Sequence, residues 1–156
     1  MVSFVSCLES TTEVKKMTGL NTVHLERCLN TLKKSFALLQ ECSSESIEYE
    51  VFRNALIKGY ELTLETSGKL LKKALKPYFA NPHEVDQLVF KDIFRHAVKH
   101  HLLEKSEGKR WFVYRDNRNS TAHDYGIGFA EETLTLIPSF FRDVEHLLQV
   151  LRHAAA

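Results

Sequence analysis

The stretch from Ile47 to Lys76, IEYEVFRNALIKGYELTLETSGKLLKKALK, decides the fold class of this chain. Its large apolar residues recur at the three- and four-residue spacings of one face of an amphipathic α-helix. Pro77 follows directly and should end the helix, because proline lacks a backbone N–H and its ring clashes with the preceding turn. Gly68 weakens the helix by about 1 kcal/mol relative to alanine without abolishing it. The stripe that predicts a helix over residues 47–76 consists of Phe52, Leu56, Tyr60, Leu64, Leu71 and Leu75.

The same spacing predicts more helices elsewhere in the chain. They are expected over residues 21–42, 85–101, 109–125 and 129–153. Gly108 should separate the second and third of these segments, and Pro138 should kink or divide the last one. No segment alternates between apolar and polar residues as a strand would. The chain is therefore predicted to be all-α: an up-down antiparallel four-helix bundle with an additional short or kinked helix.

The composition is that of one ordinary globular domain. The chain has 156 residues, and its 21 Lys and Arg nearly balance its 20 Asp and Glu. This balance excludes a strongly basic or acidic tail as the main binding device. We expect residues 1–19, which are rich in Ser and Thr, to form a flexible N-terminal extension, and residues 20–156 to form the helical domain.

The cysteines and the apolar runs predict the compartment. Cys7, Cys28 and Cys42 are odd in number and far apart, which is not the pattern of a disulfide framework. No apolar run approaches the roughly 18 residues that span a bilayer, and the first residues lack the basic segment of a secretory signal. We therefore expect a cytoplasmic protein with no membrane contact.

One polar stretch, RDNRNSTAHDY at residues 115–125, carries the groups best suited to chemistry. On a helix with 3.6 residues per turn, Asn119 and His123 lie one turn apart on the same face. Arg118 and Tyr125 share the adjoining stripe. Taken alone, these residues fit a solvated helix end rich in capping residues as well as they fit a functional site.

The order of these residues resembles that of a known family. Arg118-Asn119-x-x-x-His123-x-Tyr125 is similar to the RxxxxH motif of HEPN domains, in the extended form that ends in His-x-Tyr. Tyr60-Glu61-x-x-x-Glu65-x-x-x-Lys69 resembles the pattern on the long second helix of the nucleotidyltransferase substrate-binding branch, which also places a tryptophan where Trp111 stands. The resemblance covers residues 20–153. Gly68 departs from it, because the family usually has a tryptophan just before the lysine.

The resemblance implies a fold, a partner and an activity. It implies a helical bundle that forms a homodimer, with the two RxxxxH motifs meeting at the dimer cleft, and a minimal nucleotidyltransferase as the cognate partner. In active members the motif is that of a metal-independent endoribonuclease, the pair works as toxin and antitoxin, and some pairs silence the toxin by transferring AMP to the tyrosine. The catalytic residues would be Arg118, Asn119 and His123, the modified residue Tyr125, and further cleft residues Glu61, Glu65 and Lys69.

The residue types suit RNA cleavage without a metal. A neutral imidazole accepts the proton of the attacking 2′-hydroxyl, and an imidazolium protonates the leaving oxygen. Two copies of His123 would divide these base and acid roles between them. A guanidinium such as that of Arg118 stabilises the charged phosphorane, and Asn119 would orient the imidazole or bind a phosphate oxygen. No GxGxxG or P-loop is present, so we expect no bound cofactor and a nucleotide-binding half on another chain.

Two alternatives remain open at the level of the sequence. A non-catalytic subunit that binds substrate for the nucleotidyltransferase would carry the same family pattern. A metal site at His96, His100 and His101 is disfavoured, because no HExxH glutamate or further ligand has the required spacing. Residues 91–118 carry eight Lys and Arg against four Asp and Glu, which indicates either a surface that attracts phosphates or a solvated face with local pairs.

Overall fold

The computed structural model describes residues 20–121 and 127–155, and these are helical with no strand. The helices are α2 (Val23–Gln40), α3 (Ile47–Ala74), α4 (Phe90–Lys99), α5 (Lys105–Thr121) and α6 (Ile127–Ala155), with short 3₁₀ helices at Lys76–Tyr78 and Pro82–Gln87. The all-α prediction is confirmed. Within the described ranges, none of the helices combines the length and apolarity needed to cross a membrane. The expected extension at residues 1–19 lies outside the described residues.

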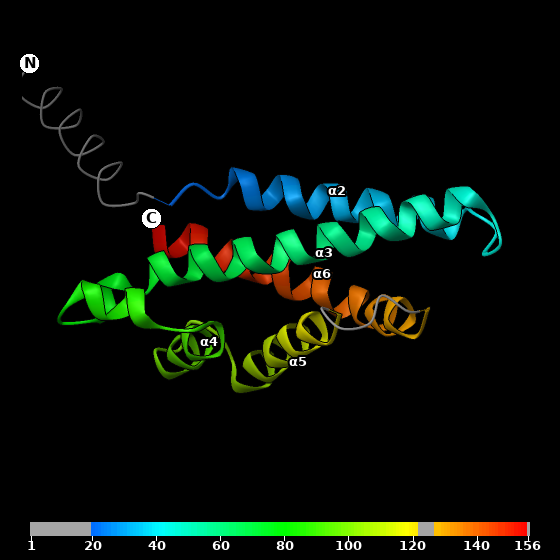
Figure 1. The fold of residues 1–156 in the computed structure, drawn as a ribbon. Coiled ribbons are helices and arrows are strands. Elements are labelled where there is room, and N and C mark those ends of the chain that lie inside the picture. Colours follow the sequence, from blue (N-terminus) through cyan, green and yellow to red (C-terminus); the bar gives the residue numbers. More distant parts are fainter. Residues whose placement is uncertain (1–19, 122–126, 156) are drawn as a thin grey trace, which may run out of the picture.

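The four long helices form the predicted up-down bundle. Along the bundle, α2 and α3 run antiparallel as a hairpin, α5 returns in the direction of α2, and α6 returns in the direction of α3 (Figure 1). The short α4 packs against α3 and α5 at one end of the bundle, which makes it the additional helix of the prediction. Helix α5 is thereby held between α4 and α6, which positions the part of the polar stretch that lies on α5, up to Thr121.

An aromatic cluster fills the core between α3, α4, α5 and α6. The indole of Trp111 stacks on Phe94 with ring centroids 4.7 Å apart, and Phe140 lies 4.7 Å from the ring of Tyr60. All four side chains are fully buried. Burial of each ring stabilises the fold by roughly 2–3 kcal/mol. Trp111 therefore belongs to the core and anchors α5 two turns before Arg118.

Several helix boundaries differ from the sequence prediction, and Pro138 does not divide its helix. Helix α4 begins at Phe90 rather than at residue 85, because Pro82–Gln87 form a 3₁₀ turn in which the side chain of Asn81 accepts from the backbone N–H of His83 at 3.1 Å. Helix α3 ends at Ala74 and gives way to the 3₁₀ turn that contains Pro77. Helix α6 passes through Pro138 undivided, since this exposed proline sits on a helix whose inner face is completely buried.

The expectation that Gly108 separates two helices was wrong. Gly108 lies inside α5, where a Cβ atom would come within 2.7 Å of Cγ2 of Val98. The glycine is therefore needed for the close approach of α4 to α5 and does not mark a chain break.

Gly68 has a similar explanation. A Cβ atom at this position would lie 2.9 Å from the ring of Phe90. The ring of Phe90 from α4 thus lies next to position 68 of α3, where the family resemblance predicts a tryptophan. An aromatic ring therefore packs at this position although α3 itself has a glycine there.

Candidate functional site

An ion pair between α3 and α5 joins two parts of the sequence pattern. Nη2 of Arg118 donates to Oε1 of Glu65 at 2.8 Å, although the residues are 53 positions apart in the chain. The side chains are 31% and 40% exposed, respectively, so both remain accessible to a ligand. A pair this exposed contributes less than about 1 kcal/mol to stability. The arrangement therefore presents a guanidinium and a carboxylate at the surface more than it holds the helices together.

Buried polar residues beneath this pair determine the position of α5. The hydroxyl of Tyr60 donates to the backbone oxygen of Tyr114 at 2.8 Å, a carbonyl one helical turn before Arg118. The side-chain amide of Asn117 donates to Oγ1 of Thr133 on α6 at 3.0 Å. Together these two bonds attach α5 to α3 and α6 at the turn that carries Arg118.

Burial also sets the charge state of the tyrosine at this junction. Desolvation raises the pKa of Tyr60 above its ordinary value, and a nearby carboxylate, Glu132, raises it further against the opposing effect of Asn117. The phenol is therefore neutral and donates its proton to the carbonyl throughout the physiological range. Its role is to position the backbone.

The other predicted site residues occupy separate places. Asn119 is exposed on α5, next to Arg118. Glu61 lies one turn before Glu65 on α3 and pairs with Lys58 at 3.6 Å. Lys69 is exposed and shares no ion pair within residues 20–121 and 127–155. The structure thus brings Arg118 to Glu65, whereas His123 and Tyr125 lie outside the described residues.

Sequence reasoning missed the polar supports of the site. The sequence places Tyr60 in the apolar stripe and in the family pattern of the long second helix but predicts no hydrogen bond for it, and it does not single out Asn117 or Thr133. A tyrosine in an otherwise aliphatic stripe was the available signal, because a buried phenol normally requires a hydrogen-bond partner. For Thr133 the sequence offers no comparable signal.

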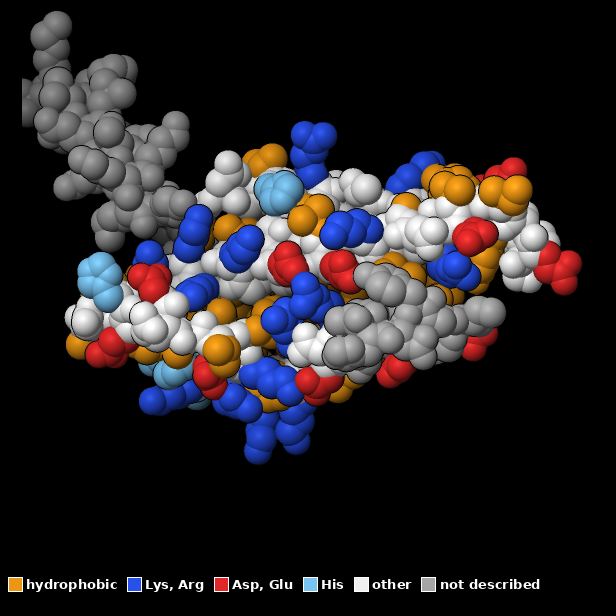
Figure 2. All heavy atoms as spheres, in the orientation of Figure 1, with side chains coloured by type: hydrophobic (Ala, Val, Ile, Leu, Met, Phe, Trp, Pro, Cys, Tyr) orange, Lys and Arg blue, Asp and Glu red, His pale blue; other side chains and the backbone are white. Residues whose placement is uncertain are grey.

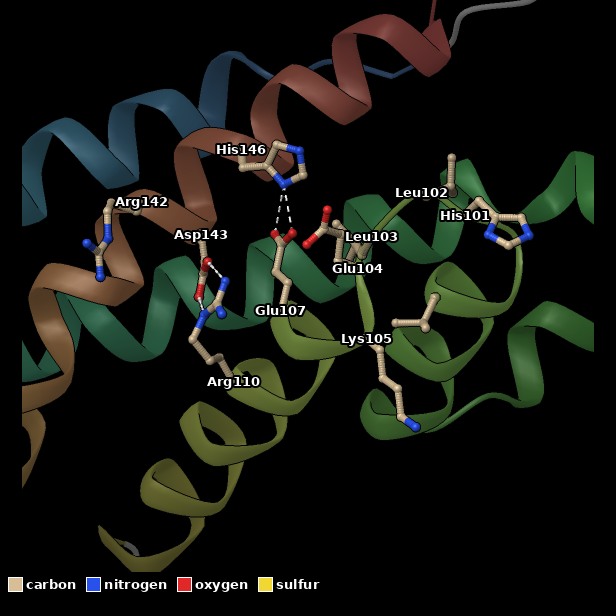
Figure 3. A pocket seen from close by; sticks show the side chains of 11 residues that line it. His101, Leu102, Leu103, Glu104, Lys105, Glu107, Arg110, Arg142, Asp143 and His146 are labelled. Carbon is tan, nitrogen blue, oxygen red and sulfur yellow. Dashed lines mark hydrogen bonds and ion pairs between the residues drawn. The ribbon is translucent and has the colours of Figure 1, made fainter.

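A second polar cluster surrounds a hollow of about 1020 Å³ near the opposite end of α5 (Figure 3). There Asp143 of α6 accepts two hydrogen bonds from Arg110, each 2.8 Å long. Glu107 pairs with Nδ1 of His146 at 2.8 Å. The carboxylate side chains are each only 6% exposed, and each has its own partner, Arg110 for Asp143 and the imidazole of His146 for Glu107.

This cluster serves the fold more than it serves a ligand. Besides Arg110, Asp143 also accepts from the hydroxyl of the buried Tyr114. Burial, and then this bond to a carboxylate, raise the pKa of Tyr114, which keeps its proton in place. The inward-facing polar groups satisfy one another across α5 and α6. No three His, Cys, Asp or Glu residues in the described parts of the chain are grouped to hold a metal ion.

Comparisons with known proteins identify the family of the chain. A model of the family described as "Nucleotidyltransferase substrate binding protein like" matches residues 23–153, a range that includes α3, the motif and most of α6. The chain belongs to this family. The contact between the long helix α3 and Arg118 of the motif is therefore a feature of a member of this family.

A named protein and a solved structure, both from Haemophilus influenzae, are similar to the chain described here. One is named "Probable ribonuclease HepT"; it is 27% identical over 137 residues, covering 85% of this chain and 92% of the relative. The other is HI0074, whose structure is described as revealing the fold of a substrate binding domain of a nucleotidyltransferase. It superposes with a TM-score of 0.73 at 26% identity, covering 85% of this chain and 99% of HI0074.

Proposed function

We propose that this chain is a HEPN-type partner of a minimal nucleotidyltransferase and cleaves RNA without a metal ion. Arg118, Asn119 and His123 form the catalytic set at a cleft between two copies of the chain. In the cell it acts in the cytoplasm as the toxin of a toxin–antitoxin pair. The similarity to a relative named as a ribonuclease and membership of the family support this proposal.

One observation carries the proposal: the 2.8 Å contact between Arg118 and Glu65. The two residues come from separate parts of the HEPN-like pattern, and they meet at a solvent-accessible position. A guanidinium held there by a carboxylate is oriented before substrate arrives, which lowers the entropy lost on binding a phosphate. Supporting bonds from Tyr60 and Asn117 fix the helix beneath it.

The reaction follows from the groups present. The 2′-hydroxyl of a nucleotide attacks its own 3′-phosphate while one imidazole takes the hydroxyl proton. A P–O bond to the next nucleotide breaks, and an imidazolium gives a proton to the departing 5′-oxygen. The products are a 2′,3′-cyclic phosphate and a 5′-hydroxyl. Arg118 stabilises the phosphorane charge that develops between these steps.

The division of acid and base roles implies a homodimer. Each copy supplies one His123, and a second copy supplies the other imidazole. Apolar surface for such an interface exists on the helices that flank the site, where Leu62 of α3 is 43% exposed and Val113 of α5 is 50% exposed. Light scattering should give twice the monomer mass of 18.0 kDa at micromolar concentration. A monomer under these conditions contradicts the shared site.

Cleavage by the purified chain tests the enzymatic proposal. A single-stranded RNA with a 5′-label is incubated with the protein in EDTA, and the cyclic phosphate is identified by mass spectrometry. Arg118→Ala and His123→Ala should each lower the rate at least about 100-fold. Matched controls are Arg152→Ala, whose guanidinium pairs with exposed Glu26 at 3.1 Å, and His153→Ala at an exposed position of α6. Both controls should retain the wild-type rate.

A second candidate is a subunit that binds substrate for the nucleotidyltransferase without cleaving RNA. The description of HI0074 as a substrate binding domain favours it. Under this alternative the purified chain leaves RNA intact in every buffer, and its expression alone does not arrest growth. Cleavage that persists in both the Arg118 and His123 variants contradicts the proposed mechanism.

We also propose Tyr125 as the residue that the partner modifies. In the sequence it follows His123 by two residues, so AMP attached to its hydroxyl would place a bulky anion beside the catalytic imidazole and exclude RNA. The transfer joins the tyrosine oxygen to the α-phosphate of ATP and releases pyrophosphate.

Intact mass spectrometry tests this modification. Co-expression with the cognate nucleotidyltransferase should add the mass of AMP to the wild-type chain and suppress cleavage. Tyr125→Phe should show no added mass and remain active beside its partner. Tyr78→Phe, which alters a tyrosine 44% exposed outside the motif, is the control and should be modified like the wild type. Equal modification of Tyr125→Phe contradicts the assignment.

A further inference from the structure

The outer face of α4 and α5 carries an excess of positive charge. Figure 2 shows Lys and Arg side chains gathered over these two helices. Two carboxylates lie among them: Asp92 pairs with Arg95 at 2.6 Å and Asp116 pairs with Lys91 at 2.7 Å. We call this surface the basic face; its cations are Lys91, Arg95, Lys99, Lys105, Lys109 and Arg115.

The remaining charges of the segment point elsewhere. Arg110 and Glu107 turn towards α6, where they pair with Asp143 and His146. Glu104 and Lys105 both line the hollow on that side, and Lys105 also lies beside Phe112. With Glu104 included, the face has six cations against three carboxylates, and this net charge of +3 contrasts with a net charge of +1 for the whole chain.

Aromatic rings support the cations of this face. The guanidinium of Arg95 lies 5.1 Å from the centroid of Phe112, and Arg115 lies 5.0 Å from the centroid of Phe90. Nζ of Lys91 lies 5.8 Å from the same Phe112 ring. These distances lie in the range of cation–π contacts, and nucleic-acid bases stack on arginine and aromatic side chains.

A hollow of about 250 Å³ opens beside Phe112 between the two helices. Val98, Gly108 and Phe112 line it, and Val98 packs against Gly108 because the glycine has no side chain. Arg95, Lys105 and Lys109 stand at its rim. Apolar walls beneath a ring of cations are the combination that holds a base and the phosphates on either side of it.

We infer that the basic face is a binding surface for single-stranded RNA, with one base seated in the hollow beside Phe112 and phosphates held by Arg95, Lys105 and Lys109. This inference rests on the proposed ribonuclease function, because it names how the substrate of that site is held. The basic face and Arg118 lie on different sides of the same helix, and Lys109 and Asn119 are about 15 Å apart along its axis. A strand seated on the face would reach Arg118 by running along α5 and around it.

Two properties of the surface favour single-stranded RNA over a protein partner. The cations alternate with aromatic rings, and the hollow is sized for one planar group and is not an extended apolar groove. Single-stranded RNA has phosphates that pair with the cations and bases that stack on the rings, so it matches both properties. An acidic protein surface would match only the cations.

Fluorescence anisotropy with an RNA that cannot be cleaved tests the inference. The probe is a labelled single-stranded oligonucleotide in which every 2′-hydroxyl is methylated, so that binding is measured apart from chemistry. The triple variant Arg95→Ala, Lys105→Ala, Lys109→Ala should bind at least about tenfold more weakly at 0.1 M salt. The slope of log affinity against log salt should also fall by about 2, since each phosphate contact contributes about 0.7 for a single strand.

A matched triple variant controls for the loss of charge. Lys34→Ala, Lys76→Ala, Arg152→Ala removes the same charges from exposed positions elsewhere, including an arginine in an exposed ion pair. It should retain wild-type affinity within about twofold. Phe112→Leu keeps an apolar residue in the packing and should weaken binding about fivefold or more with little change in salt slope.

The outcomes separate this inference from the proposed function. Equal affinity of the two triple variants overturns the inference, while loss of cleavage in Arg118→Ala still supports the active site. If the first triple variant binds RNA normally but no longer co-purifies with the nucleotidyltransferase, the basic face is a protein interface and the inference is wrong. Weak binding of the first variant together with an inactive wild type supports the surface and overturns the ribonuclease proposal.

Discussion

The two halves of α5 are similarly polar in sequence but differ in what their charged side chains contact. In the first half, Glu107 and Arg110 face α6. Glu107 itself and Asp143, the partner of Arg110, are each only 6% exposed. In the second half, Arg118 and its partner Glu65 are 31% and 40% exposed. The same helix therefore carries pairs with nearly buried carboxylates at one end and a pair with an exposed carboxylate at the other, although Arg110 at 44% is no less exposed than Arg118 at 31%.

This difference separates a structural role from a functional one. A nearly buried carboxylate that loses its cation is strongly unfavourable, so the first half is expected to determine stability. An exposed pair contributes little to stability but keeps its charges available to a ligand. The free energy of unfolding of a few variants therefore tests the comparison, and the predictions below run from the largest effect to the smallest.

Asp143→Ala should produce the largest loss. It removes the carboxylate that accepts from the buried Tyr114 phenol and from Arg110, leaving the phenol only Oγ of Ser139 at 3.0 Å. We expect the free energy of unfolding, measured by urea denaturation, to fall by about 2 kcal/mol, since hydrogen bonds to a charged group contribute about 1.5–3 kcal/mol. Asp143→Asn retains an acceptor for Tyr114 and should lose less. A loss below 1 kcal/mol for the alanine variant contradicts a structural role for the cluster.

High pH should also destabilise the protein, through Tyr60 and Tyr114. Burial raises the pKa of both in the folded state, whereas an unfolded tyrosine ionises near pH 10. The stabilising effect of the neutral phenols is therefore complete below about pH 10 and is lost as pH rises beyond it. Each tyrosine should lower the free energy of unfolding by up to about 1.4 kcal/mol per pH unit above that point.

Phenylalanine variants isolate this alkaline effect. Tyr60→Phe and Tyr114→Phe should each flatten the decline above pH 10, as followed by urea denaturation at a series of pH values. Tyr78→Phe removes an exposed phenol and should leave the decline unchanged. An unchanged slope in both buried variants would mean that neither phenol resists ionisation in the folded state.

Gly108→Ala should have a smaller effect, of about 1 kcal/mol. The new Cβ atom would meet Cγ2 of Val98 at 2.7 Å, and such overpacking costs about 1–3 kcal/mol. Replacing a helical glycine with alanine offsets about 1 kcal/mol of this. In a Val98→Ala background the clash is absent, so the same substitution should become stabilising. Thermal denaturation of the four proteins of this cycle measures the change of sign.

Arg118→Ala and Glu65→Ala should have the smallest effect on stability. Each should change the free energy of unfolding by less than about 1 kcal/mol, and a double-mutant cycle should give a coupling energy of similar size, because the pair is exposed. Urea denaturation measures both quantities. If Arg118→Ala were as destabilising as Asp143→Ala, the distinction between the two halves of α5 would fail.

Local periodicity made most of the fold predictable. The apolar stripe of residues 47–76 correctly indicated α3, and Pro77 correctly indicated its end to within two residues. The errors at residues 85–89 and Gly108 have a common physical reason. Along the sequence alone, a glycine suggests the end of a helix. In the folded chain, the close packing of a neighbouring helix requires a glycine at that position inside the helix.

By itself, the sequence determined the helices, the order of the bundle and the polar motif that contains Arg118, because these depend on the spacing of neighbouring residues along one helix. Only the tertiary structure decided which polar residues meet: Glu65 with Arg118, Asp143 with Arg110, and Glu107 with His146. Such pairs depend on how helices cross and which faces they turn to each other. Residues far apart in the chain carry no local signal of that geometry.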